Sequence, residues 1–295
     1  MELQDGHLKA IARSIRRGRC VPFLGAAVNV TCHDYDGLPL GYEVAESLAT
    51  NFRYEIADKK NLPRVSLIHE RVVKRVNLVD DLRGMLPDHQ REPSRILTTL
   101  AEMPIDLYIT TNYDRLLERA LSKSGREPIV VVQTTTVLEN RAGLDEWIDG
   151  EEGSRRPLVY KIHGTFREPQ RDRDDDSPLI ITEDDYIDFL ILLGSKEHGV
   201  PKVIADRLKN DTLLFLGYSL EDWDFRALYK IIMKSYEGHR FTQPRFSVQV
   251  KPPQYWMGFW AEQKVDILEA DVYEFIDQLK AAYLALQEGG VNAVP

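Results

Sequence analysis

The stretch that decides the fold is Ile105-Asp106-Leu107-Tyr108-Ile109-Thr110-Thr111-Asn112-Tyr113-Asp114-Arg115. Its apolar part predicts a strand, and an Asn and an Asp follow where a helix is expected to begin. In an open α/β sheet, ligands bind outside the carboxyl ends of the strands, so this position suits a binding site. A simpler interpretation is that Asn112 is an ordinary N-cap and that Asp114 in the first turn suits the helix dipole. Residues at the ends of the other strands decide between these interpretations.

The composition is that of a globular protein. The 295 residues, 43% hydrophobic and 29% charged, are enough for one large α/β domain or two small ones. The longest apolar runs are far shorter than the ~20 residues of a membrane helix. The first residues contain no apolar signal core, which argues against secretion and favours a cytoplasmic location. Only Cys20 and Cys32 are present, too few for a disulfide framework or a four-cysteine zinc site.

The charge balance argues against nucleic acid as a partner. The formal net charge is −9, from 38 basic and 47 acidic residues. A protein that binds the nucleic-acid backbone normally has a basic footprint, so direct nucleic-acid binding is not expected. The local basic cluster of Arg13, Arg16, Arg17 and Arg19 fits a solvated helix end, where the dipole favours cations.

Short apolar strands alternate with helices along most of the chain. Strands are expected at residues 20–24, 105–109, 128–132, 157–162, 179–181, 211–216, 246–250 and 265–268, and a helix at 112–123. Residues 139–156 and 167–176 are expected to be surface loops, the first with Trp147 turned inward. The alternation predicts an α/β fold, a Rossmann-like parallel sheet with helices on both faces.

One region departs from this alternation. Residues 41–100 are helical and amphipathic, with expected helices at 42–52, 66–76 and 78–86 and breaks at Pro63, Asn77 and Pro87. We interpret this region as a helical insertion between the first two strands. We expect a single domain over residues 1–290, with a tail at 291–295.

Three other predicted strands also end in small or polar residues. Gly25-Ala26-Ala27-Val28-Asn29 follows the first strand, and its small residues allow the backbone to approach a phosphate closely. It lacks the Gly-Lys-Ser/Thr of a P-loop and the glycines of a GxGxxG fingerprint, so tight packing of a strand into a loop explains it equally well. His163-Gly164 and Gly217-Tyr218-Ser219 follow two later strands. Together with Asn112, these segments predict a nucleotide site at one edge of the sheet.

The four segments together resemble the sirtuin family, specifically its divergent bacterial branch. Gly25–Asn29 resembles the Gly-Ala-Gly-x-Ser phosphate loop, and Thr110–Asp114 resembles Thr-Gln-Asn-Ile-Asp. His163-Gly164 resembles the catalytic His-Gly, and Gly217-Tyr218-Ser219-Leu220 resembles Gly-Thr-Ser-Leu. Their order and spacing fit over about residues 8–285, which is nearly the whole chain.

The sequence also departs from the family pattern. Ala27 replaces the second glycine, Asn29 the serine and Thr111 the glutamine. Two cysteines cannot build the zinc module of the protein-deacylating sirtuins, and a helical insertion follows the first strand instead. In these features the chain is similar to the sirtuin-like NAD hydrolases of bacterial antiphage defence, which work with a HerA-type ATPase or an Argonaute-type partner or are fused to other domains.

The resemblance implies NAD as substrate and a role for each segment. Asn112 can hold a water or the ribose hydroxyls, and His163 can act as general base because an ordinary imidazole pKa of about 6.5 lies near working pH. Asp114 would fix the nicotinamide amide, as the resemblance implies. The candidate cofactor-binding residues are Gly25, Ala26, Asn29, Asp114, Gly217 and Ser219. The other histidines lack ligand spacing, so no metal is expected.

Three activities remain open. The first is a NAD glycohydrolase that releases nicotinamide and ADP-ribose and depletes NAD in antiphage defence. The second is a protein deacylase or ADP-ribosyltransferase, against which the missing cysteine module counts. The third is a module that senses NAD or ADP-ribose without cleaving it. Chain length and the resemblance lead us to expect control by assembly, as a homo-oligomer or with a partner protein, through the helical insertion or the final helix.

Overall fold

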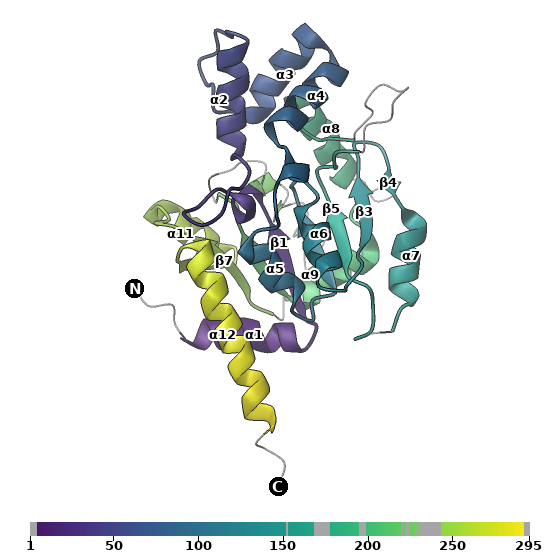
Figure 1. The fold of residues 1–295 in the computed structure, drawn as a ribbon, viewed down its shortest axis with the longest axis vertical. Helices are drawn as coiled ribbons and strands as arrows, with labels where there is room; N and C mark the ends of the chain where they lie inside the picture. The colour runs from purple at the N-terminus through teal and green to yellow at the C-terminus, as the bar shows by residue number, and fades with distance from the viewer. Residues whose placement is uncertain are drawn as a thin grey trace.

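One sheet of eight strands organises the molecule in a computed structural model (Figure 1). The strand order is β4-β3-β5-β2-β1-β6-β7-β8, and every neighbouring pair is parallel except β3 and β4. The structure describes residues 5–151, 153–167, 178–194, 199–219, 221, 225–227, 229–230 and 243–291. The strands are β1 (Cys20–Leu24), β2 (Leu107–Thr110), β3 (Ile129–Gln133), β4 (Leu138–Glu139), β5 (Leu158–Lys161), β6 (Thr212–Leu216), β7 (Arg245–Gln249) and β8 (Asp266–Glu269).

The predicted α/β class is therefore confirmed, with one correction at an edge. Strand β4 pairs antiparallel with β3, so the sheet is mostly rather than wholly parallel. The central strand β1 is buried along its whole length, with β2 on one side and β6 on the other. A strand covered on both faces is expected to be continuously apolar, as Cys20–Leu24 is apart from its proline.

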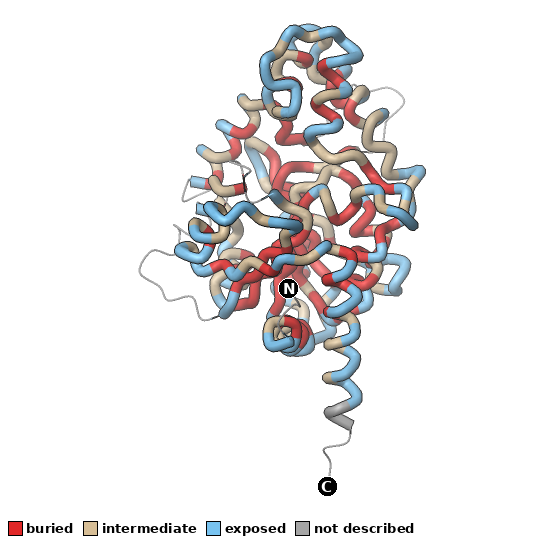
Figure 2. The backbone as a smooth tube through the Cα atoms, turned by 90° about the vertical axis from the view of Figure 1, so that its left-hand side faces the viewer, coloured by how far each residue is buried: buried red, intermediate tan, exposed pale blue. Residues whose placement is uncertain are grey.

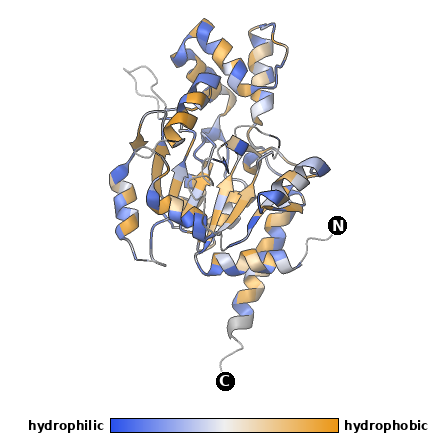
Figure 3. Cartoon of the chain, turned by 180° about the vertical axis from the view of Figure 1, so that it is seen from behind, coloured by the Kyte–Doolittle hydropathy of each residue, from blue (hydrophilic) through white to orange (hydrophobic). Residues whose placement is uncertain are grey.

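Two apolar clusters show that helices cover both faces of the sheet. Successive strand residues point to opposite faces, so Leu24 joins one cluster and Phe23 the other. The first cluster contains residues of α1 (Asp5–Arg16), α5 (Arg95–Ala101), α6 (Leu116–Lys123) and α12 (Val272–Val291). The second contains residues of α7 (Arg141–Asp149), α8 (Glu183–Gly194), α9 (Lys202–Asn210) and α11 (Gln254–Glu262). In Figure 3 the interior strands are accordingly the most hydrophobic part of the chain.

Three helices pack around a third cluster at one end of the molecule (Figures 1 and 2). They are α2 (Gly41–Asn51), α3 (Leu62–Val73) and α4 (Arg75–Met85). Their apolar faces enclose Phe166, Leu179 and Ile181, which come after β5. The expected helical run is present, but its breaks differ: Pro63 lies in the first turn of α3, and the chain turns at Lys74, which has a positive φ of 77°.

Two other segments differ from the prediction. Residues 139–156, expected as a loop, contain α7, which Asn140 caps by accepting a hydrogen bond from the Gly143 amide at 3.1 Å. Trp147 is buried as expected. Residues 179–181 form no strand: they are buried between clusters, and the Ile180 amide donates to the His163 carbonyl at 3.0 Å. Residues 168–176 of the second expected loop lie outside the described residues.

Within the described ranges, none of the helices combines the length and apolarity needed to cross a membrane. The same part of the chain contains no group of three His, Cys, Asp or Glu side chains placed to hold a metal ion. Cys20 is buried in β1, and the Cys32 thiol lies 3.3 Å from the Asp34 carboxylate.

Candidate functional site

Four loops leave the carboxyl ends of four neighbouring strands. Strands β5, β2, β1 and β6 lie side by side and run parallel. The loop after β1 contains the 3-10 helix η1 (Ala26–Asn29), and Asn112, His163 and Gly217 come directly after β2, β5 and β6. The structure thus brings all four predicted segments to one edge of the sheet. Strand β1 lies between β2 on one side and β6 on the other. Open α/β sheets bind ligands at the carboxyl ends of the strands, where the strand order changes direction in this way.

The loops after β1 and β6 pack backbone against backbone. The Gly25 amide donates to the Leu216 carbonyl at 2.9 Å, and the Ala27 amide donates to the Gly217 carbonyl at 3.2 Å. A Cβ on Gly25 would lie 2.5 Å from the Gly217 oxygen, and Gly217 has a φ of 78°. Both glycines are therefore required for close packing of the two loops, and the Gly25 N–H does not face a phosphate. The Ala26 amide donates to none of the described residues and remains the candidate phosphate contact.

Asn112 bridges β2 and the loop after β1. Its side-chain Nδ2 donates to the Gly25 carbonyl at 3.1 Å, and its backbone amide donates to Thr110 Oγ1 at 3.0 Å. Helix α6 begins only at Leu116, so the expected start at Asn112 is wrong and Asn112 is not its N-cap. With Nδ2 fixed, the amide oxygen of this half-buried residue is the atom left to meet a ligand.

Asn29 and Asp114 form a buried polar pair across 85 residues of sequence. Asn29 Nδ2 lies 3.2 Å from both carboxylate oxygens of Asp114, and the Leu116 amide donates to Asp114 Oδ1 at 3.0 Å. Burial is the main cause that raises the pKa of Asp114 to about 6, and the positive charge of Lys161 opposes it. Asp114 is therefore mostly ionised at pH 7.5 but protonated in mild acid.

Lys161, which the sequence analysis did not single out, lies beneath this pair. It is only 1% exposed at the end of β5, and its ammonium bonds to the Asp114 backbone carbonyl at 2.5 Å and to Glu118 Oε1 at 3.1 Å. A buried charge must be paired. A lysine inside an apolar strand of the sequence therefore indicates that an acidic side chain lies nearby. Its partner Glu118, on α6, could not be identified from sequence spacing.

His163 is enclosed by aromatic rings. It is 5% exposed, and the rings of Tyr186 and Phe189 meet it edge-on at 5.1 and 5.4 Å. The Tyr186 hydroxyl lies 3.4 Å from Nδ1, a long contact. Burial lowers the pKa of His163 to about 3, so the expectation of titration near neutral pH is corrected. The imidazole is neutral at working pH. Among the residues that the structure describes, its ring forms no hydrogen bond to another predicted site residue.

Ser219 lies at the rim of the site. It is exposed, and its hydroxyl accepts the Glu221 amide at 3.3 Å without touching the other candidates. Its neighbour Tyr218 is a packing residue: the hydroxyl bonds to the Leu24 carbonyl at 3.2 Å and the ring stacks on Phe225. Trp223 lies outside the described residues.

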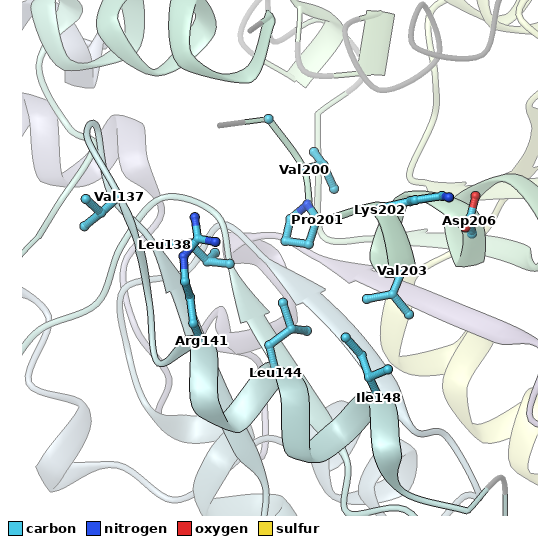
Figure 4. A pocket seen from close by; sticks show the side chains of 11 residues that line it. Val137, Leu138, Arg141, Leu144, Ile148, Val200, Pro201, Lys202, Val203 and Asp206 are labelled. Carbon is cyan, nitrogen blue, oxygen red and sulfur yellow. The ribbon is translucent and has the colours of Figure 1, made fainter. Parts of the chain in front are cut away.

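A cavity of about 570 Å³ lies elsewhere, between α7 and the start of α9 (Figure 4). Its lining includes Leu144, Ile148 and Val203, and its charged groups are Arg141, Lys202 and Asp206. None of the predicted site residues lines it. The strand-end loops, which gather the polar side chains, are the better candidate for chemistry.

The SIR2-like domain family matches residues 106–268, which is more than half of the chain. Similar proteins named NAD(+) hydrolase ThsA include one from Enterococcus faecium, 24% identical over 93% of this chain and 57% of that protein. Another, from Cytobacillus dafuensis, is 33% identical over 44% of this chain and 22% of that protein. Defense-associated sirtuin 2 of Bacillus subtilis is 23% identical over 77% of this chain and 20% of its own length.

These relatives are longer proteins, and the chain spans little more than half of the Enterococcus faecium relative. A solved structure described as "Structural Basis for the Mechanism and Regulation of Sir2 Enzymes" superposes with a TM-score of 0.51 at 13% identity, over 98% of this chain and 100% of that one. This likeness shows a shared fold. The chain belongs to the SIR2-like domain family.

Proposed function

We propose that this chain is a NAD glycohydrolase that cleaves NAD to nicotinamide and ADP-ribose. The observation that carries the proposal is the convergence of the Asn112–Gly25 contact and the Asn29–Asp114 pair at the carboxyl ends of adjacent strands. The relatives named NAD(+) hydrolase support NAD as the substrate. Small loop residues beside a strand end suit a dinucleotide, because the backbone can approach the phosphates.

The reaction breaks the bond between the ribose C1′ and the nicotinamide nitrogen. The bonding electrons leave with the nicotinamide, whose ring charge disappears, so the leaving group needs no proton. The sugar carbon then resembles an oxocarbenium ion, as in other glycosidic cleavages. A water oxygen bonds to C1′, and the water loses one proton. The protein must hold the ring, exclude other nucleophiles and orient one water.

Asn112 and His163 are the proposed catalytic residues. The Gly25 carbonyl fixes the Asn112 amide, so its oxygen can accept a hydrogen bond from the attacking water or a ribose hydroxyl. Burial keeps His163 neutral, so a ring nitrogen retains its lone pair. A weak base suffices here, because a water attacking a cation-like carbon becomes acidic as the bond forms.

The remaining site residues serve binding in this proposal. Ala26 supplies an N–H to the pyrophosphate, Gly25 and Gly217 keep the loops close, and Ser219 contacts the rim of the nucleotide. We also propose that α2–α4 take the place of the zinc module, since the chain has only two cysteines. The proposed setting is cytoplasmic NAD depletion in antiphage defence, as a homo-oligomer or with a HerA-type ATPase or Argonaute-type partner.

Following NAD, nicotinamide and ADP-ribose by mass spectrometry tests the proposal, with the chain alone and with products of neighbouring genes. We expect stoichiometric nicotinamide and ADP-ribose without any acylated peptide. Asn112→Ala should slow cleavage by about 10²-fold or more, as loss of one orienting group typically does. Asn51→Ala, on the exposed end of α2, is the matched control and should cleave at the wild-type rate.

Three results would contradict the proposal. Intact NAD in every assembly state, with calorimetric binding, would select a sensing module instead. Turnover that strictly requires an acyl-lysine peptide would select a deacylase. Equal rates in the wild type and Asn112→Ala would remove Asn112 from the mechanism.

A further inference from the structure

Arg75, the first residue of α4, contacts the chain where it returns to the sheet after β5. Its Nη2 donates to the Leu179 carbonyl at 2.5 Å, and its Nη1 donates to Asp185 Oδ2 at 2.8 Å. The side chain is 30% exposed, and the Glu70 carboxylate of α3 lies 3.6 Å from the same Nη1. One guanidinium from the helical insertion thus holds both ends of the segment from Leu179 to Asp185.

This segment in turn holds His163. The Ile180 amide donates to the His163 carbonyl at 3.0 Å, so the backbone of the histidine is fixed from this side. Tyr186 and Phe189 follow directly in α8, and their rings enclose the imidazole at 5.1 and 5.4 Å. The position of residues 179–185 therefore sets both the backbone and the surroundings of His163.

Asp185 makes the segment rigid. Its Oδ2 accepts the Ile181 amide at 3.0 Å and the Thr182 amide at 2.9 Å, in addition to the Arg75 guanidinium. Hydrogen bonds to an ionised carboxylate are shorter and stronger than those between neutral groups. The turn into α8 and the arginine are consequently joined through a single oxygen atom.

The local sequence does not favour this placement of Arg75. Lys74 directly before it has a φ of 77°, which costs a residue with a side chain. A cation at the first position of a helix also faces the positive end of the helix dipole. Conformations that are locally unfavourable persist where the surrounding structure holds them. The contacts with residues 179–185 are the tertiary interactions that hold this one.

Two other arginines of α3 also bond to α8, which lies beside α3 and α4 (Figure 1). Arg64 pairs with Glu183 at 2.9 Å, and Arg71 pairs with Asp184 at 3.1 Å. Both arginine side chains are more than half exposed, and exposed ion pairs contribute little to stability. Arg75 differs because it also bonds Leu179, the residue before Ile180.

We propose that Arg75 is a positioning residue for His163, through which the helical insertion fixes the place of the proposed base. This inference rests on the proposed function. A base must lie within hydrogen-bond reach of the water that it activates, and a displacement of about 1 Å slows such a reaction strongly. In the proposed function the loops after β1 and β6 hold the dinucleotide, whereas Arg75 acts on the segment after β5. Its loss should therefore affect the chemical step more than the binding of NAD.

The first test measures amide hydrogen exchange by NMR in the full chain. Ile180 is buried and its amide is bonded, so the wild type should protect it. In Arg75→Met the exchange at Ile180 should be at least about 10-fold faster, and any change in β1 should be smaller. A loss of global stability would accelerate both alike. Arg71→Met, the matched control, should leave exchange at Ile180 within about 2-fold of the wild type.

The second test measures NAD cleavage by the folded protein in an assembly state that is active. Arg75→Met should lower kcat at least about 10-fold and leave KM within about 3-fold of the wild type. Arg71→Met should match the wild type in both constants. Should Arg75→Met not fold, Arg75→Lys replaces it, because lysine keeps the charge but lacks the planar fork that bonds Leu179 and Asp185 together. Its changes should have the same sign.

The outcomes for the inference and for the function are distinct. Wild-type kcat in Arg75→Met would overturn the role of Arg75 and leave NAD cleavage standing. Equal acceleration of exchange at Ile180 and in β1 would also overturn it, because Arg75 would then act only on global stability. If the wild type cleaved NAD in no assembly, the proposed function would fail. Exchange at Ile180 would then test alone whether Arg75 holds the segment, and unchanged exchange would overturn the inference.

Discussion

His163 is held neutral by its surroundings, and this has a consequence for stability. Burial against Tyr186 and Phe189 lowers its pKa from 6.5 to about 3. Between these values the unfolded chain binds a proton that the folded chain excludes. The stability contributed by this residue is therefore fully present above pH 6.5 and is lost as the pH falls towards 3.

We predict that His163→Phe removes this acid-sensitive contribution. Between pH 7 and pH 5 the wild type should lose about 2 kcal/mol more unfolding free energy than the variant, from the linkage of a single buried imidazole. Urea denaturation at the two pH values measures the difference. His33→Phe, at an exposed position, should keep the wild-type pH dependence. Identical pH dependence in the wild type and His163→Phe would show that folding does not lower the pKa of His163.

Asp114 acts in the opposite direction over part of the same range. Burial, with Glu118 and Asp88, raises its pKa from 3.8 to about 6 against the effects of Lys161 and the Leu116 amide. The folded chain binds the extra proton between these values, so stability rises as the pH falls from 6 to 3.8. The comparison of His163→Phe with the wild type isolates the histidine because Asp114 is common to both.

Some residues of the candidate site could be predicted from the sequence, and others could not. Asn112, His163 and Gly217 were predicted at strand ends, because the transition from an apolar run to polar residues is a local pattern. The pairing of Asn29 with Asp114 spans 85 residues and depends on loop geometry, so it had no local signal. The lowered pKa of His163 results from burial against Tyr186 and Phe189 of α8. The sequence alone did not predict that α8 packs against this histidine.

At the scale of elements, the turn after β5 is held by one glycine. Gly164 has a φ of 86°, and a Cβ added there would lie 1.5 Å from the Pro178 carbonyl oxygen. The segment after Pro178 also binds the site, because the Ile180 amide donates to the His163 carbonyl. The glycine therefore permits a close approach that positions both His163 and the 178–181 segment.

We predict opposite effects for two Gly→Ala substitutions. Gly164→Ala should destabilise the protein by roughly 2–4 kcal/mol, from the left-handed backbone and the clash with Pro178. Gly84→Ala should stabilise it by about 0.5–1 kcal/mol, because Gly84 is exposed within α4 and an added Cβ meets nothing within 4 Å. Thermal or urea unfolding of both variants measures the signs. A neutral Gly164→Ala would show that the turn can move away.

The elements that were mispredicted share a physical cause. Residues 139–156 are mostly polar, so the sequence did not predict α7 there. The few apolar residues of α7, Leu144 and Trp147, are enough to form one buried face of the helix. The apolar residues 179–181 resembled a strand, yet their burial comes from packing near α2–α4 and not from a ladder. The hydrophobic pattern of a sequence predicts which residues are buried. Whether those residues form a helix, a strand or a loop depends on the tertiary structure around them.

At the scale of the whole molecule, polar residues lie at both ends of the strands. Those at the carboxyl ends form the candidate site, and those at the amino ends stabilise the fold. At the amino ends of the strands, Arg207 of α9 bonds both oxygens of Asp106 at 2.8 and 3.0 Å and also contacts Asp211 and the Gly18 carbonyl. Asp106 precedes β2 and Asp211 precedes β6. This ion network ties three central strands to α9 at the edge opposite the candidate site.

Substitutions at the amino ends of the strands should therefore lower the stability of the protein without changing its catalytic activity. Arg207→Met should destabilise the chain by about 3–5 kcal/mol, because Asp106 would lose this ion pair and the fully buried Asp211 would keep the more distant Arg19, at 3.5 Å. Cleavage of NAD per folded molecule, measured well below the melting temperature, should match the wild type, since no strand-end residue at the carboxyl edge loses a contact. Lys202→Met, exposed on the same helix, controls for the loss of a cation and should change stability by less than about 0.5 kcal/mol. A stable Arg207→Met variant with impaired cleavage would mean that the amino edge takes part in catalysis and would refute this division.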